Sequence, residues 1–231
     1  MASAGALALI VSFLAVVLPV AAYLLGHAPL RWLCSPAETL YWAAKLRALL
    51  SSSGKLVELM ARMEAWALQE LTITGQRSLS TAEAYPLVLP GSSQPGVEEA
   101  LEACATGIAR LENPWHDGLL RGSAAEVLEQ LQLQAARLCV LQGKTERARR
   151  HFCYAEEVAE ERARSDAETK SSTKDQLRLL RGAVAVGLLA AGERSPTLLP
   201  AMQEAAVQLL DLAAGGCTPA KEILQGVAGY S

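Results

Sequence analysis

Two short segments of this sequence carry residue types that can do chemistry. In residues 113–118 (NPWHDG), a histidine stands beside a carboxylate, a pairing that general acid–base catalysis uses. Adjacent residues in a turn are a poor catalytic arrangement, however, and no nucleophile is tied to His116 and Asp117 by spacing. We therefore interpret this segment as a structural turn.

The second segment contains His151 and Cys153, on either side of Phe152, and both of these side chains can bind metals. Two ligands two residues apart, with no second pair, fall short of a zinc site. The sequence also lacks a phosphate-binding loop, a dinucleotide fingerprint, a nucleophile elbow and the His-Glu-x-x-His motif. We therefore predict no catalytic, cofactor-binding or metal-binding residues, and expect that the protein is not an enzyme.

Four cations stand together at the start of a predicted helix. Cations there oppose the helix macrodipole, at a cost of about a few tenths of a kcal/mol each when exposed. An acidic tail of a protein partner or lipid headgroups would compensate for this cost. The alternative is a solvated face, with pairs such as Glu146 to Arg150 and Glu160 to Arg164. The cluster comprises Lys144, Arg147, Arg149 and Arg150.

Residues 74–96 lack helical periodicity and contain three prolines, three glycines and four serines, so we predict a long loop. Within it, residues 85–90 (YPLVLP) are apolar and extended. This stretch either buries itself across the helices or serves as a binding strap for a partner. The candidate partner-binding residues are therefore Tyr85, Leu87, Arg137, Lys144, Arg147, Arg149 and Arg150.

A pattern of small and aromatic residues surrounds the cation cluster. It consists of Ala136, Gly143, Ala148, Phe152 and Ala155. Small residues let two helices approach closely, glycine permits the turn between them, and an aromatic ring fills the gap toward a neighbouring helix. In this spacing, residues 129–162 resemble a tetratricopeptide repeat, which implies antiparallel helical hairpins stacked into an array.

The resemblance is incomplete. Cys139 occupies a position that is usually aromatic, and no proline closes the second helix. Tetratricopeptide domains that grip chaperone tails use several Lys and Asn residues, whereas the candidate first helix offers only Arg137, so that carboxylate clamp is not supported. Because stacked repeats need about three units, we expect a degenerate array, or else an ordinary helical bundle with one chance match.

The composition favours close-packed helices and a reducing compartment. Hydrophobic residues make up 51% of the 231 residues but aromatic residues only 5%, so the apolar content is mainly Ala, Leu and Val. A net charge of -3 leaves no electrostatic footprint for nucleic acid. Five scattered cysteines without a C-x-x-C pair indicate free thiols rather than a disulfide framework.

The N-terminal residues 4–26 are 23 consecutive uncharged residues, long enough to cross a hydrocarbon core of about 30 Å. Pro19 interrupts the run, but membrane helices tolerate proline. The cations follow the span, starting with Arg31, so the positive-inside rule places the C-terminal part in the cytosol. We predict a membrane anchor over 1–30 and a cytosolic domain over 31–231. A cleaved signal peptide ending near Ala22 and a buried core helix are the alternatives.

Helical periodicity organises the rest of the chain. Ser35-Pro36-Ala37-Glu38 combines an N-cap serine, a proline at the first position and a glutamate that completes a capping box. Ser123 and Glu126 have the same spacing. No alternating strand pattern occurs, so the predicted fold is all-α. We expect helices over about 36–50, 55–71, 97–111, 123–142, 145–164, 174–191 and 197–214, with a short closing helix from Thr218 and a polar linker over 166–174.

These features together predict a membrane-anchored, non-catalytic adaptor that binds protein partners through a helical-repeat surface. The anchor and repeat resemble those of receptors in the mitochondrial outer membrane or endoplasmic reticulum, with the N-terminus outside the cytosol. A secreted or luminal helical protein with a cleaved signal is one alternative. An accessory subunit of a membrane-bound enzyme complex is another.

Overall fold

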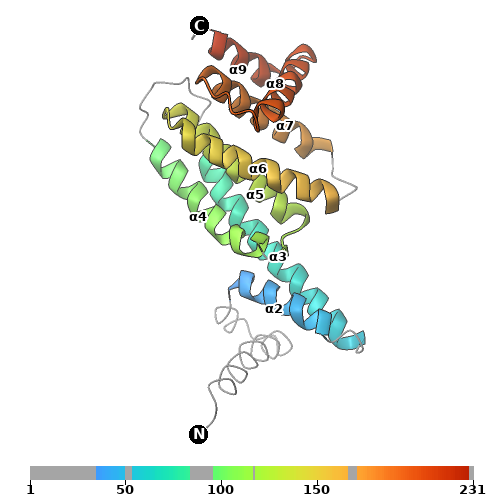
Figure 1. Cartoon of the computed structure of the whole chain (residues 1–231). Helices are drawn as coiled ribbons and strands as arrows, with labels where there is room; N and C mark the ends of the chain where they lie inside the picture. The colour runs from blue at the N-terminus through green and yellow to red at the C-terminus, as the bar shows by residue number, and fades with distance from the viewer. Residues whose placement is uncertain (1–34, 50–53, 84–95, 117, 166–170, 229–231) are drawn as a thin grey trace. The chain divides into compact units, whose positions relative to one another are not determined.

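The computed structural model describes residues 35–49, 54–83, 96–116, 118–165 and 171–228, and in these ranges every regular element is a helix (Figure 1). The all-α prediction is confirmed for this part of the chain. The predicted membrane span at 4–26 lies outside the described residues. None of the described helices is both long and apolar enough to cross a membrane.

The helices form two compact units. One unit comprises residues 1–71 with 113–120, and the other comprises 72–112 with 121–231, so the helices over 54–83 and 97–116 each contribute to both. The helices are α2 (Pro36–Leu49), α3 (Gly54–Glu83), α4 (Val97–His116), α5 (Gly122–Leu141), α6 (Thr145–Ser165), α7 (Ser171–Ala190), α8 (Leu199–Ala214) and α9 (Thr218–Ala228).

The predicted capping box at the start of α2 is confirmed. The backbone N–H of Glu38 donates to Ser35 Oγ at 3.2 Å, and the N–H of Ser35 donates to Glu38 Oε2 at 3.0 Å. Two backbone donors at the helix start are thereby satisfied. In the first unit, α2 packs on the beginning of α3 through a small apolar cluster of Ala43, Met60 and Met63.

The predicted loop over 74–96 is wrong for its first ten residues, because α3 continues to Glu83. Leu79 and Ala82 are buried and extend the apolar stripe that Leu71 belongs to. Gly75 interrupted the pattern in the sequence, yet it marks a close helix contact: a Cβ there would lie 2.6 Å from Val127 Cγ1 of α5. Residues 84–95, with Tyr85 and Leu87, lie outside the described part.

The predicted stop at Asn113-Pro114 is also wrong, because α4 runs on to His116 with Pro114 in its last turn. A proline there removes one backbone hydrogen bond near the helix end, where the loss interrupts few others. Residues 113–116 are therefore helical rather than the turn that we predicted. Asp117 and the side chain of His116 lie outside the described residues.

The predicted cap at Ser123 is wrong as well. Helix α5 begins at Gly122, and its N-cap, Arg121, makes no side-chain capping bond. The Ser123 hydroxyl instead lies 3.4 Å from Thr72 Oγ1 of α3. Ser123 has the capping-box spacing to Glu126, yet its hydroxyl contacts α3 and does not cap α5.

Helices α5 and α6 form a hairpin whose turn matches the prediction. Gly143 has φ 69°, the left-handed region in which glycine carries no Cβ penalty. Its N–H bonds to Val140 O at 3.0 Å, and the N–H of Lys144 bonds to Cys139 O at 2.9 Å. These two bonds make a Schellman motif. Equivalent bonds from Gly192 and Glu193 end α7, and others from Gly216 and Cys217 end α8. The described helices α5, α7 and α8 therefore end in the same motif.

The predicted small and aromatic residues lie inside the α5–α6 hairpin. Phe152, Ala136 and Ala148 are fully buried, and Ala155 is almost fully buried. They join side chains of α7 and the start of α8 in one apolar cluster, of which Leu180, Val184, Leu188 and Met202 are members. Helix α7 itself begins at Ser171, three residues before the predicted start, so the C-terminal part of the predicted polar linker is helical.

Candidate functional site

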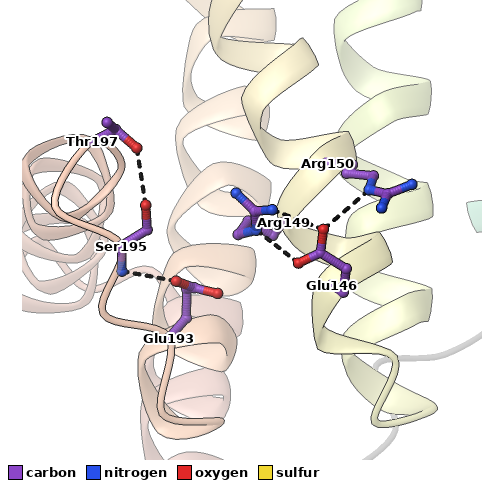
Figure 2. A network of polar contacts seen from close by, with 6 residues as sticks. All are labelled: Glu146, Arg149, Arg150, Glu193, Ser195 and Thr197. Atoms are coloured by element: carbon purple, nitrogen blue, oxygen red, sulfur yellow. Dashed lines mark hydrogen bonds and ion pairs between the residues drawn. The ribbon is translucent and has the colours of Figure 1, made fainter.

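The four cations of the predicted cluster occupy the turn before α6 and its first two helical turns. Lys144 precedes the helix, and the three arginines follow within it. Arg149 and Arg150 both bind Glu146, as Figure 2 shows: Arg149 Nε donates to Oε2 at 2.9 Å and Arg149 Nη2 to Oε1 at 2.7 Å. Arg150 Nε donates to the same Oε1 at 3.1 Å. The expected pair of Glu146 with Arg150 is therefore confirmed.

Glu146 has a strongly acidic carboxyl group as a result. Hydrogen bonds from Arg149 and then Arg150 lower the pKa of Glu146 to about 2. The carboxylate stays charged at all physiological pH values and neutralises part of the cluster. The second expected pair also forms, with Arg164 Nη2 3.4 Å from Glu160 Oε2.

Arg149 of α6 lies close enough to the turn between α7 and α8 to be affected by the charge of Glu193 in that turn. Figure 2 shows its guanidinium on the side of α6 that faces this turn, and the charge of Glu193 contributes to raising the pKa of Arg149, after the larger effect of Glu146. Glu193 Oε1 accepts a hydrogen bond from the N–H of Ser195 at 2.8 Å. Ser195 Oγ lies 2.9 Å from Thr197 Oγ1. Glu193, Ser195 and Thr197 thus form their own set of polar contacts in the turn before α8.

Lys144 and Arg147 differ from their neighbours. Both are exposed, and neither forms an ion pair with a described carboxylate. Beside Arg147 on the same helix, His151 Nδ1 lies 2.7 Å from Gln132 Oε1 of α5. Burial, and then the positive charge of Arg147, lower the pKa of His151. The cluster therefore consists of two arginines that share one carboxylate and two cations without an ion-pair partner among the described residues.

Of the other predicted partner-binding residues, the structure describes Arg137. Arg137 is half-buried on α5, where its charge acts on the Cys104 thiol, whose pKa burial raises to about 12. Among the described residues, no group of three or more His, Cys, Asp or Glu is placed to hold a metal ion. Tyr85 and Leu87 lie outside the described part.

The sequence did not predict a buried charged network at the other end of the α5–α6 hairpin. Arg162 Nη2 of α6 lies 2.7 Å from Glu129 Oε2 of α5, and Arg162 Nη1 lies 3.7 Å from Glu126 Oε2. One helix farther on, Arg181 Nε of α7 donates to Glu156 Oε1 of α6 at 2.6 Å. The network ties three helices together through ion pairs.

Glu129 is the most buried charge in this network, with 4% of its surface exposed. Burial raises the pKa of Glu129 to about 7, although Arg162 and Arg181 act in the opposite direction. Desolvation therefore outweighs the ion pair. A signal was present in the sequence: apolar residues recur all round α5, which fits a helix with neighbours on every side, so the polar residues between them are buried too. Besides Glu129, the buried polar residues of α5 are Gln130, Gln132 and Gln134.

Comparisons with known proteins give no relative to reason from. No family model, no curated protein and no solved structure matches this chain.

Proposed function

We propose that this protein is a membrane-tethered, non-catalytic adaptor, and that Lys144 and Arg147 help to bind an acidic segment of a protein partner. The observation that carries the proposal is the contrast within the cluster. Arg149 and Arg150 share Glu146, whereas Lys144 and Arg147 are exposed and have no carboxylate partner among the described residues. Unpaired cations at a helix start oppose the macrodipole, and a bound acidic segment would remove that cost.

The helical hairpins are the proposed scaffold for this surface, as a degenerate tetratricopeptide-like array. Burial of Ala136, Ala148, Phe152 and Ala155 supports this relationship, because these positions carry the close helix contacts in the repeat. The proposed location is the cytosolic face of the mitochondrial outer membrane or endoplasmic reticulum. The uncharged residues 4–26 support it as the tether, which raises the local concentration of the surface near membrane-bound partners.

Deleting residues 1–30 tests the tether. We expect the full chain to stay in the membrane pellet after an alkaline carbonate wash, and the shortened chain to move to the supernatant, because the proposed apolar span is gone. Fractions are quantified by immunoblot, with a known single-span protein as control. The tether is refuted if the shortened chain still pellets, or if the full chain is washed off.

Charge reversal tests the binding surface. The assay is proximity labelling in cells, with the labelling enzyme fused to the C-terminus of the full chain. With Lys144→Glu and Arg147→Glu combined, we expect labelling of the main neighbours to fall about tenfold, because like charges now face the acidic segment. Both side chains are exposed, so the fold should not change.

The matched control combines Lys174→Glu and Lys221→Glu, which changes the net charge equally at two other exposed cations. The control should label the same neighbours as the unaltered chain. Equal labelling by both double variants would refute the binding surface while leaving the tether untouched.

A further inference from the structure

The turn between α7 and α8 presents a serine hydroxyl that holds no part of the fold together. Ser195 Oγ has Thr197 Oγ1 as its hydrogen-bond partner among the described residues, and both belong to the same turn. The backbone of Ser195 does the structural work instead: its carbonyl accepts the N–H groups of Leu198 at 3.1 Å and Leu199 at 2.9 Å. Pro196 and Thr197 are exposed.

Ser195 is one of three Ser/Thr-Pro pairs in the chain, and its environment differs from that of the others. Ser35 Oγ accepts the N–H of Glu38, so the hydroxyl of that pair caps α2. Thr218, before Pro219, is exposed at the start of α9. Ser195 bonds with Glu193 and Thr197 of its own turn, and Arg149 lies on the side of α6 that faces this turn (Figure 2).

Two arginines lie around this turn. Arg194, next to Ser195 in the chain, is exposed and donates from Nη1 to the carbonyls of Leu189 and Glu193. Arg149 reaches toward the turn from α6, where Glu193 is the nearby carboxylate. A phosphate carries nearly two negative charges and three acceptor oxygens, so it would compete successfully with the single charge of Glu193 for an arginine. The start of α8 also favours an anion.

We propose that Ser195 is a phosphorylation site for a proline-directed protein kinase, and that Arg149 and Arg194 hold the resulting phosphate. In the reaction, Ser195 Oγ forms a bond to the γ-phosphorus of ATP. The bond between that phosphorus and the β,γ-bridging oxygen breaks, ADP leaves with the electron pair, and the hydroxyl proton passes to the base of the kinase. The proposal concerns this turn alone and does not rest on the partner-binding role.

Incubation of the full chain in detergent with ATP, Mg²⁺ and a proline-directed kinase tests the acceptor. Mass spectrometry of the peptides follows phosphate on Ser195, Ser35 and Thr218. We expect Ser195 to be modified at least about tenfold faster than Ser35, because the Ser35 hydroxyl caps α2 whereas that of Ser195 bonds within its own turn. A synthetic peptide of residues 190–200 checks the sequence as a substrate. The acceptor role is overturned if that peptide is not modified, or if it is modified while folded Ser195 is not.

Phosphorus NMR of the phosphorylated chain tests the two arginines. Phosphoserine has a second pKa of about 6, and adjacent cations should lower it relative to the phosphorylated 190–200 peptide. Arg149→Gln and Arg194→Gln should each raise this pKa in the full chain, and Glu193→Gln should lower it further. A pKa equal to that of the peptide and unchanged in Arg149→Gln would overturn the proposed phosphate contact. A merely structural effect of these substitutions would not give opposite shifts.

Discussion

Replacing Phe152 with alanine should lower the free energy of unfolding by about 3–5 kcal/mol. Its side chain is fully buried in the cluster that joins α5, α6, α7 and the start of α8, so the substitution leaves a cavity where all four segments meet. Phe152→Leu, which keeps much of the volume, should cost less. The measurement is urea unfolding of the full chain, followed by helical circular dichroism.

The matched control is Leu210→Ala. The Leu210 side chain of α8 is 53% exposed, so its truncation should change the free energy of unfolding by less than about 0.5 kcal/mol. If Phe152→Ala is as mild as Leu210→Ala, the ring does not organise the packing of these helices. The resemblance to a repeat would then lose its physical basis.

Replacing Glu129 with glutamine should stabilise the protein above pH 7. The pKa of Glu129 rises from 4.5 to about 7 on folding, mainly because burial disfavours the charged carboxylate. The folded state therefore binds the proton more tightly than the unfolded state. Below about pH 4.5 both states are protonated and the group has no effect. Between about pH 4.5 and 7 the unfolded chain gives up the proton while the folded chain keeps it, so the free energy of unfolding falls; above pH 7 the loss is complete at about 3 kcal/mol.

The difference in the free energy of unfolding between Glu129→Gln and the unaltered chain isolates the contribution of the Glu129 carboxylate. Glutamine resembles the protonated carboxyl group, so the variant should be more stable by about 3 kcal/mol at pH 8 and nearly equal at pH 4.5. Glu157→Gln makes the same chemical change at an exposed position of α6 and should have little effect at either pH. The opposing titration of His151 is common to all three proteins and cancels.

A loss of stability in Glu129→Gln at pH 8 would contradict this prediction. If Glu129→Gln destabilises the protein at pH 8, the ion pair with Arg162 outweighs the desolvation of the carboxylate. Removing one partner would then leave the half-buried guanidinium with the more distant Glu126 as its carboxylate. Unfolding curves at pH 4.5, 6 and 8 distinguish the two outcomes by their sign.

The sequence by itself determined features that depend on residues a few positions apart. The all-α class followed from periodicity, the start of α2 from Ser35 and Glu38, and the α5–α6 turn from Gly143. The pair of Glu146 with Arg150 also follows from helical spacing alone. In each case the partners are fixed by local geometry before any packing occurs.

Only the tertiary structure decided how the ambiguous positions are used. Gly75 interrupts the pattern in the sequence, but Val127 of α5 packs closely on α3 at that position, and packing outweighs local propensity. The contacts of Glu129 with Arg162 and of Glu156 with Arg181 join residues 25 or more positions apart. Such pairs leave no spacing pattern in one sequence, because the packing of whole helices, rather than the helical repeat, sets their distance.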